Sequence, residues 1–185
     1  MFKITDIKGT STLNNGVQMP YFGLGVYQIP NSEVVKAIRW ALGCGYRLID
    51  TASLYENEEG VGQAVRNAGI PRAEIFVTTK VWNSDQGYDS TLRAFDASLQ
   101  RLGLDYVDLY LVHWPVADKY KQTWKALERI YREGRARAIG VSNFLIHHLE
   151  DLAASAEIQP MVNQVEFHPL LVQQPLLDYC HSKGI

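Results

Sequence analysis

Four polar side chains in the sequence have the chemistry needed to deliver a proton to an oxygen atom. Tyr55 would be the acid, because a nearby lysine ammonium stabilises a phenolate and lowers the tyrosine pKa from its ordinary value near ~10. Lys80 is the candidate ammonium, and Asp50 would hold it in place and keep it charged. His113 could direct a carbonyl oxygen toward the hydroxyl by donating a ring N–H. Together these groups are suited to protonate an alkoxide as it forms, with Tyr55 as the general acid.

Each of these residues also has an ordinary structural role open to it. Asp50 could cap a loop, and Tyr55 could be a half-buried packing residue. Lys80 could form a structural ion pair, and His113, which precedes Trp114, could be a core histidine with satisfied hydrogen bonds. Their joint placement at the ends of successive predicted strands favours the chemical role.

Short apolar runs alternate along the chain with longer segments of helical periodicity. The runs predict strands at residues 22–27, 47–51, 75–81, 107–114, 137–143 and 161–167. The periodic segments predict helices at residues 32–43, 57–68, 89–102, 120–133, 145–155 and 173–183. The expected N-caps are Asn31 or Ser32, Asn57 and Asp89. Before the first strand, the pair Asn15-Gly16 predicts a hairpin turn.

Strands that alternate with helices of this length predict βα units and a parallel sheet. Because the carboxyl ends of parallel strands meet at one edge, Asp50, Lys80 and His113 should converge there, with Tyr55 on a loop above them. The repeat of roughly thirty residues fits an open doubly wound sheet or an eight-stranded barrel. The lack of a GxGxxG after the first strand, and polar residues at several strand ends, favour the barrel.

The composition, with 46% hydrophobic and 21% charged residues among 185, is typical of a soluble globular protein. The net charge of -2 gives no basic patch for nucleic acid or an anionic membrane, so we expect neither partner. No apolar run has the length of a signal peptide or a membrane span, and we expect a cytoplasmic location. Cys44 and Cys180 lack CxxC spacing, so we expect buried, reduced thiols, no disulfide and no metal site.

Several ordered motifs resemble those of the aldo-keto reductase family, and the resemblance runs the whole length of the chain. These motifs are GLGVYQ, GYRLIDTASLYENEEGVGQAV, FVTTKVWN, SLQRLGLDYVDLYLVHWP, GRARAIGVSNF and VNQVEFHP. The resemblance implies an α/β fold, a (β/α)8 TIM barrel whose amino end is closed by an N-terminal β-hairpin. It also implies an oxidoreductase that transfers a hydride from the cofactor NADPH, oxidised to NADP, to an aldehyde or ketone.

By this resemblance, the catalytic tetrad of the family falls on the four residues considered first. Ser142, Asn143 and Gln164 match residues that hydrogen-bond the nicotinamide carboxamide. Without the resemblance, Asn143 could equally cap the helix that begins at Leu145, and Gln164 could be an interior hydrogen-bonding residue.

The resemblance also assigns residues around the nicotinamide and the substrate. Val26, Tyr27 and Asp50 fall at cofactor-contacting positions, although Val26 stands where many relatives carry threonine. Residues that match the substrate cleft are His113 and, along its wall, the aromatic residues Tyr27, Trp82 and Trp114. Such a wall favours apolar or aromatic small-molecule carbonyl substrates.

In the family, the residues that hold the 2′-phosphate of NADP follow an eighth strand, and this sequence ends at Ile185. We therefore expect residues 1–185 to be a single, partial barrel domain, truncated after about six βα units, that binds NADPH weakly by itself. The full-length form is expected to be a monomeric enzyme. Two alternatives remain, which are a truncated or inactive barrel fragment and a cofactor-binding regulatory subunit.

Overall fold

The computed structural model describes residues 6–185, and its first element is a β-hairpin. β1 (Thr10–Thr12) pairs with β2 (Gln18–Pro20) in antiparallel register. In the turn between them Gly16 has a φ of 88°, a backbone conformation that glycine adopts without a steric penalty. The hairpin predicted from Asn15-Gly16 is therefore confirmed.

Six short strands form one parallel sheet, in which each strand pairs with the next one along the chain. These strands are β3 (Gly23–Gly25), β4 (Leu48–Asp50), β5 (Phe76–Val81), β6 (Val107–Val112), β7 (Ala136–Ser142) and β8 (Asn163–Gln164). Every one overlaps a strand predicted from the apolar runs. Most are shorter than predicted, although backbone hydrogen bonds to the neighbouring strand continue beyond several strand ends, as from Thr51 N to Thr78 O and from His113 N to Val81 O.

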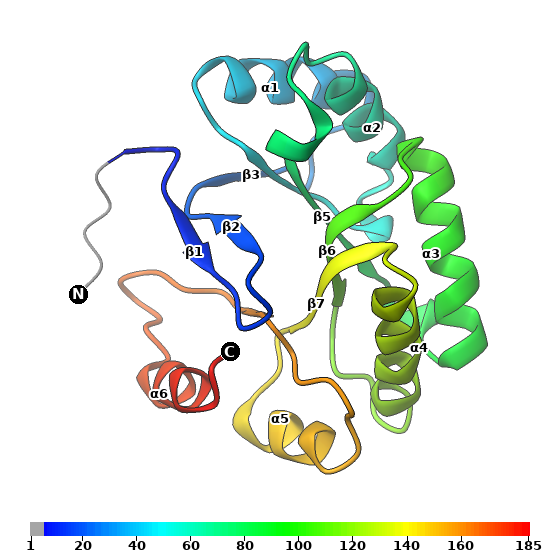
Figure 1. The fold of residues 1–185 in the computed structure, drawn as a ribbon, viewed down its shortest axis with the longest axis vertical. Helices are drawn as coiled ribbons and strands as arrows, with labels where there is room; N and C mark the ends of the chain where they lie inside the picture. Colours follow the sequence, from blue (N-terminus) through cyan, green and yellow to red (C-terminus); the bar gives the residue numbers. More distant parts are fainter. Residues whose placement is uncertain (1–5) are drawn as a thin grey trace.

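The helices follow the strands in strict alternation. They are α1 (Asn31–Gly43), α2 (Glu58–Arg66), α3 (Tyr88–Leu102), α4 (Tyr120–Arg132), α5 (Ile146–Ala153) and α6 (Gln174–Lys183). The sheet curls, and the helices lie outside the curl (Figure 1). This is the arrangement of six successive units of a (β/α)8 barrel, which confirms the predicted fold class.

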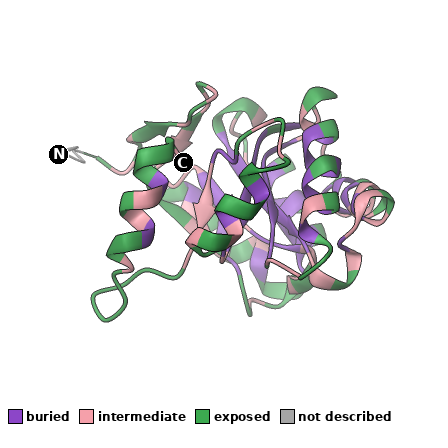
Figure 2. Ribbon diagram, turned by 90° about the horizontal axis from the view of Figure 1, so that it is seen from below, coloured by how far each residue is buried: buried purple, intermediate pink, exposed green. Residues whose placement is uncertain are grey.

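The buried residues lie along the strands of the curled sheet and on the sides of the helices that face the sheet (Figure 2). All residues of β5 and β6 are buried, since one face of each strand lies inside the curl and the helices cover the other face. On α4, the buried side chains of Trp124, Leu127 and Ile130 recur at helical spacing and form the face that packs on the sheet. Burial on both faces explains why apolar residues stand at neighbouring positions of these strands, such as Leu111 and Val112, rather than at every second position.

Polar contacts fasten the hairpin and the strands at the amino end of the sheet. In the hairpin turn, the amide Nδ2 of Asn15 donates to the backbone oxygen of Arg137 at the start of β7 (2.9 Å). On β6, the fully buried carboxylate of Asp108 accepts from Arg72 Nη2 and Arg137 Nη1, each at 2.7 Å. The two guanidinium groups compensate the buried negative charge, and the opposite, carboxyl end of the sheet is left for the site.

Of the predicted N-caps, Asn57 is confirmed in position, whereas those of α1 and α3 are wrong. Asn57 occupies the N-cap position of α2, but its side chain makes no capping hydrogen bond. The N-cap of α1 is Pro30, and the side chain of Asn31 instead accepts a hydrogen bond from a backbone N–H of α2. The N-cap of α3 is Gly87, so Asp89 lies in the first turn, where its charge is favourable to the helix dipole.

Within residues 6–185, both cysteines are free, and Cys180 is buried whereas Cys44 is exposed. The expectation of two buried thiols is therefore wrong for Cys44. None of the helices in this range combines the length and the apolar character needed to cross a bilayer. The same range contains no cluster of three or more histidine, cysteine or carboxylate side chains arranged to hold a metal ion.

Candidate active site

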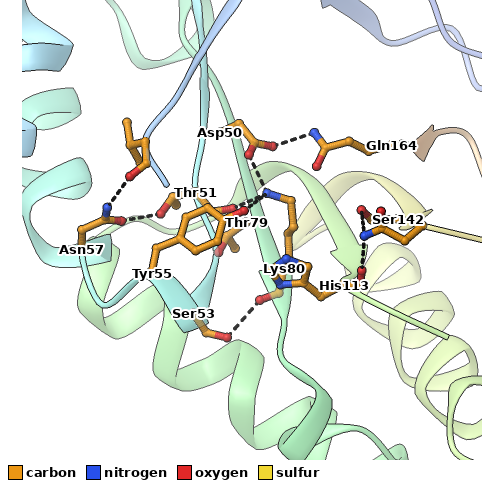
Figure 3. A network of polar contacts seen from close by, with 12 residues as sticks. Asp50, Thr51, Ser53, Tyr55, Asn57, Thr79, Lys80, His113, Ser142 and Gln164 are labelled. Carbon is orange, nitrogen blue, oxygen red and sulfur yellow. Dashed lines mark hydrogen bonds and ion pairs between the residues drawn. The ribbon is translucent and has the colours of Figure 1, made fainter. Parts of the chain in front are cut away.

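The carboxyl ends of β4 and β5 bring together three of the residues singled out from the sequence. Lys80 Nζ lies 2.5 Å from Asp50 Oδ1 and 3.4 Å from the hydroxyl oxygen of Tyr55 (Figure 3). It also donates to the backbone oxygen of Thr51 at 2.9 Å. The pairing register explains this meeting, because Asp50 lies opposite Thr78, two residues before Lys80 on the same face of β5.

Lys80 is the buried charge of the site, with a side chain only 1% exposed. Burial lowers the pKa of Lys80, while the charge of Asp50 and its hydrogen bond oppose that shift. The carboxylate is itself only 13% exposed, so the two charges face each other with little water between them. Asp50 therefore fixes the position of the ammonium and favours its charged form, as the sequence predicted.

Tyr55 lies on the 3-10 turn η1 (Ser53–Tyr55), between β4 and α2. Burial, followed by the charges of Asp50 and Tyr27, raises the pKa of Tyr55 to about 12. The predicted lowering of this pKa by Lys80 is therefore wrong, because desolvation and a neighbouring carboxylate disfavour the phenolate more than the ammonium favours it. The hydroxyl is protonated at neutral pH, which is the state that a proton donor requires.

His113 follows the end of β6 and stands beside the tyrosine. Its ring centroid lies 5.8 Å from that of Tyr55 and 5.0 Å from that of Trp82, both in edge-on geometry. Burial and the charge of Lys80 lower the pKa of His113 to about 4, so the imidazole is neutral at physiological pH. A neutral imidazole donates one ring N–H, and among the described residues its buried Nδ1 has no hydrogen-bond partner.

Ser142, Asn143 and Gln164 lie at the ends of β7 and β8, on the same rim of the sheet. Gln164 Nε2 donates to Asp50 Oδ2 at 2.9 Å, and this hydrogen bond connects β8 to the Asp50 carboxylate at the end of β4. Asn143 has a φ of 62°, and its Nδ2 donates to the backbone oxygen of His113 (3.0 Å) and to Ser142 Oγ (3.1 Å). Asn143 is not a helix cap, because Leu145 occupies the N-cap position of α5.

Aromatic side chains surround the rim. Tyr27 is 60% exposed, and its ring centroid lies 4.9 Å from that of Tyr55. Trp114, 47% exposed, and the partly buried Trp82 follow β6 and β5. Val26, in contrast, is fully buried in the core, so its side chain offers no surface to a cofactor and the position predicted for it is wrong.

A sequence model of the Aldo/keto reductase family matches residues 7–185. The chain belongs to this family. The glyoxal reductase of Bacillus subtilis is 59% identical to this aldo/keto reductase over 182 residues, which are 98% of the chain and 66% of the relative. The chain thus spans just under two thirds of the length of that protein.

Solved structures of the family superpose closely on this aldo/keto reductase chain. An aldo/keto reductase from Brucella melitensis has a TM-score of 0.93 and 52% identity, covering 95% of this chain and 70% of that one. An aldo-keto reductase from Bombyx mori in complex with NADP has a TM-score of 0.92 and 38% identity, covering 97% and 65%.

Sequence reasoning missed three residues of this aldo/keto reductase that lie around the tyrosine. Thr51 and Asn57 flank the loop that carries Tyr55, and their side chains hydrogen-bond to each other at 2.6 Å. Ser53 Oγ donates to the backbone oxygen of Lys80 at 3.1 Å. The signal available in the sequence was the density of small polar residues in the stretch DTASLYENE, which alone does not distinguish a solvated loop from a hydrogen-bonded one.

Proposed function

We propose that this chain carries the catalytic centre of an NADPH-dependent carbonyl reductase that acts on aldehydes or ketones. The observation that carries the proposal is the meeting of a protonated phenol, a buried ammonium 3.4 Å away and a neutral imidazole at one rim of the sheet. Family membership supports the reaction class, as do the name of the Bacillus subtilis relative and the NADP in the Bombyx mori structure.

Tyr55 is the general acid of the proposed reaction. NADPH, when bound, supplies the hydride that forms the new C–H bond. As that bond forms, the carbonyl oxygen takes up the electron pair, and the Tyr55 hydroxyl gives this oxygen its proton. The ammonium of Lys80 stabilises the phenolate left behind, while Asp50, 2.5 Å from that ammonium, holds it in place.

His113 supplies a second polar contact to the reacting oxygen. Because the pKa of His113 is lowered to about 4, its ring is a neutral hydrogen-bond donor that does not compete with Tyr55 for the proton. A fixed N–H aimed at an oxygen that gains negative charge stabilises the transition state more than the ground state. The edge-on packing against Trp82 restricts the ring orientation that this role needs.

Three polar groups on the rim fit the carboxamide of a nicotinamide ring. That carboxamide offers one acceptor oxygen and two N–H donors. In the described part of the chain, the Ser142 hydroxyl accepts from Asn143 and keeps its own O–H as a donor. Neither Asn143 Oδ1 nor Gln164 Oε1 has a hydrogen-bond partner there. The protein therefore offers one donor and two acceptors, which complement the one acceptor and two donors of the carboxamide. Hydrogen bonds between these groups would orient the nicotinamide ring.

The exposed aromatic groups limit the substrate class. Tyr27 packs beside the acid and Trp114 directly follows His113 in the chain, and exposed aromatic surfaces of this kind favour aldehydes with a flat or apolar substituent. The relative named for glyoxal indicates that a small dicarbonyl compound is a second suitable probe. We therefore propose benzaldehyde and glyoxal as test substrates for the same site.

The proposal is tested by following the loss of NADPH absorbance with either aldehyde at saturating NADPH. The wild-type chain should oxidise NADPH, and Tyr55→Phe, which removes only the hydroxyl, should be slower by about 10²–10⁴-fold. The matched control is Tyr21→Phe, since Tyr21 lies between β2 and β3 at the amino end of the sheet. Equal rates for Tyr55→Phe and Tyr21→Phe would contradict the assignment of the acid. NADPH binding without turnover by the wild type would favour a regulatory subunit instead.

A further inference from the structure

A second hydrogen-bond network, made by side chains other than the four catalytic candidates, closes the loop that carries Tyr55. Thr51 precedes this loop, Asn57 follows it, and the hydroxyl Oγ1 of Thr51 donates to Asn57 Oδ1 at 2.6 Å. Both side chains are fully buried. Residues 52–56, with Tyr55 among them, therefore form a loop whose two ends are joined by one buried side-chain hydrogen bond (Figure 3).

The amide of Asn57 extends this network to a neighbouring loop. Its Nδ2 donates to the backbone oxygens of Val26 (2.9 Å) and Ile29 (3.0 Å), in the connection between β3 and α1. That connection also carries Tyr27, whose ring packs on Tyr55 with centroids 4.9 Å apart. One buried amide thus uses both of its N–H donors and its oxygen to join the two loops that carry the paired tyrosines.

Within residues 52–56, few polar contacts fix the position of the acid. The turn η1 belongs to no strand, and its backbone hydrogen bond from Tyr55 N to Ala52 O (3.0 Å) lies within the loop itself. The contact between the Tyr55 hydroxyl and Lys80, at 3.4 Å, is long for a hydrogen bond. Ser53 adds one anchor through the backbone oxygen of Lys80 at 3.1 Å. At the ends of the loop, backbone hydrogen bonds join Thr51 N to Thr78 O (2.9 Å) and Val61 N to Asn57 O (3.0 Å). The side-chain bond between Thr51 and Asn57 ties these two ends to each other.

We propose that Thr51 and Asn57 are positioning residues that hold Tyr55 over Lys80 and keep Tyr27 against it. This inference rests on the proposed function, because it concerns the geometry of the same acid. Misplacement of a reacting group by about 1 Å can cost about 10²-fold in rate. Loss of one buried hydrogen bond that sets a loop is therefore expected to show in turnover as well as in stability.

The chain offers a matched pair of hydrogen bonds for the test. Thr79 Oγ1 donates to Glu58 Oε1 at 2.6 Å, the same length as the bond between Thr51 and Asn57, and all four side chains are buried. Thr51→Val and Thr79→Val thus each remove one hydroxyl. The two threonines are equally buried, and their hydrogen bonds have the same length. Only the first of these hydroxyls is bonded across the loop that carries the tyrosine.

For Thr51→Val we expect kcat with benzaldehyde to fall by about tenfold, with the KM for NADPH unchanged. Thr51→Ser keeps the hydroxyl and should restore most of the rate, whereas Thr79→Val should lose stability without this loss of kcat. Asn57→Asp serves as a second variant, because it keeps the acceptor for Thr51 but removes the two donors to the β3–α1 connection. Equal kcat losses in Thr51→Val and Thr79→Val would overturn the proposal.

A readout that needs no turnover separates this proposal from the proposed function. With tyrosine labelled by ¹³C at Cζ, the resonance of Tyr55 is assigned by its absence in Tyr55→Phe and is followed against pH. The pKa of Tyr55, about 12, should move toward the ordinary value in Thr51→Val, because a released loop exposes the phenol to water. It should remain unchanged in Thr79→Val. A wild type that reduces no carbonyl but shows this difference would contradict the reductase and support the positioning role. An unmoved pKa in Thr51→Val would overturn the positioning role.

Discussion

Replacing Lys80 by methionine removes the ammonium from the buried pair and leaves the carboxylate of Asp50 without its counter-charge. The two groups are 2.5 Å apart, with side chains 1% and 13% exposed. Breaking a buried ion pair by deleting one partner costs about 3–5 kcal/mol. Asp50 keeps some access to water and a hydrogen bond from Gln164 at 2.9 Å, so we expect a loss near the lower end, about 3 kcal/mol.

The loss is measured by urea unfolding of wild type and Lys80→Met, as a shift of the midpoint at an unchanged slope. The matched control is Lys121→Met, because the pair of Lys121 and Asp151 is nearly as short, 2.6 Å, but its side chains are 40% and 48% exposed. Exposed pairs contribute little, so this control should lose much less stability. The double variant Asp50→Asn/Lys80→Met, which buries no unpaired charge, should be more stable than Lys80→Met. Equal losses for Lys80→Met and Lys121→Met, or no recovery in the double variant, would refute the reasoning.

Two further predictions concern pH. His113 should remain neutral down to about pH 4, and because this pKa is below its unfolded value of 6.5, its contribution to stability should fall as pH drops from 6.5 toward 4. Histidine ¹⁵N chemical shifts report the titration, and a midpoint near the ordinary value would be inconsistent with the buried ring. Gln164→Glu would place a second carboxylate beside Asp50 Oδ2. Repulsion between the two negative charges raises the pKa of one of the two carboxyl groups in the folded protein. The variant should therefore lose stability as pH rises through that raised pKa. Thermal unfolding against pH checks this, and a profile parallel to that of the wild type would count against the contact.

The sequence predicted the central strands of the sheet well because these strands are buried on both faces. In β5 and β6, all of whose residues are buried, apolar residues stand at neighbouring positions, with Thr78, Thr79 and Lys80 as the polar members of β5 and Asp108 as that of β6. The meeting of Asp50 and Lys80 followed from the rule that carboxyl ends of parallel strands share one edge. Tyr55 was placed correctly above them because it lies only a few residues beyond the end of β4.

The remaining features depend on burial and on contacts between loops, which spacing along the chain does not reveal. The direction of the pKa shift of Tyr55 was wrong because it is decided by desolvation and by the distance to Asp50. Asn57 was expected to cap α2, yet its side chain is used by a threonine and by a loop about thirty residues earlier. Val26 was assigned to the cofactor site by the family resemblance, but the core covers its side chain.

The central claim is that this chain reduces a carbonyl group with a hydride from NADPH and a proton from Tyr55. The most direct measurement uses NADPH deuterated at the transferable C4 position, with benzaldehyde, and determines the deuterium in the product by mass spectrometry. We predict benzyl alcohol that carries one deuterium on carbon, formed by the wild type and slower by about 10²–10⁴-fold with Tyr55→Phe. Alcohol without deuterium, or deuterated alcohol formed equally fast by Tyr55→Phe, would contradict the account.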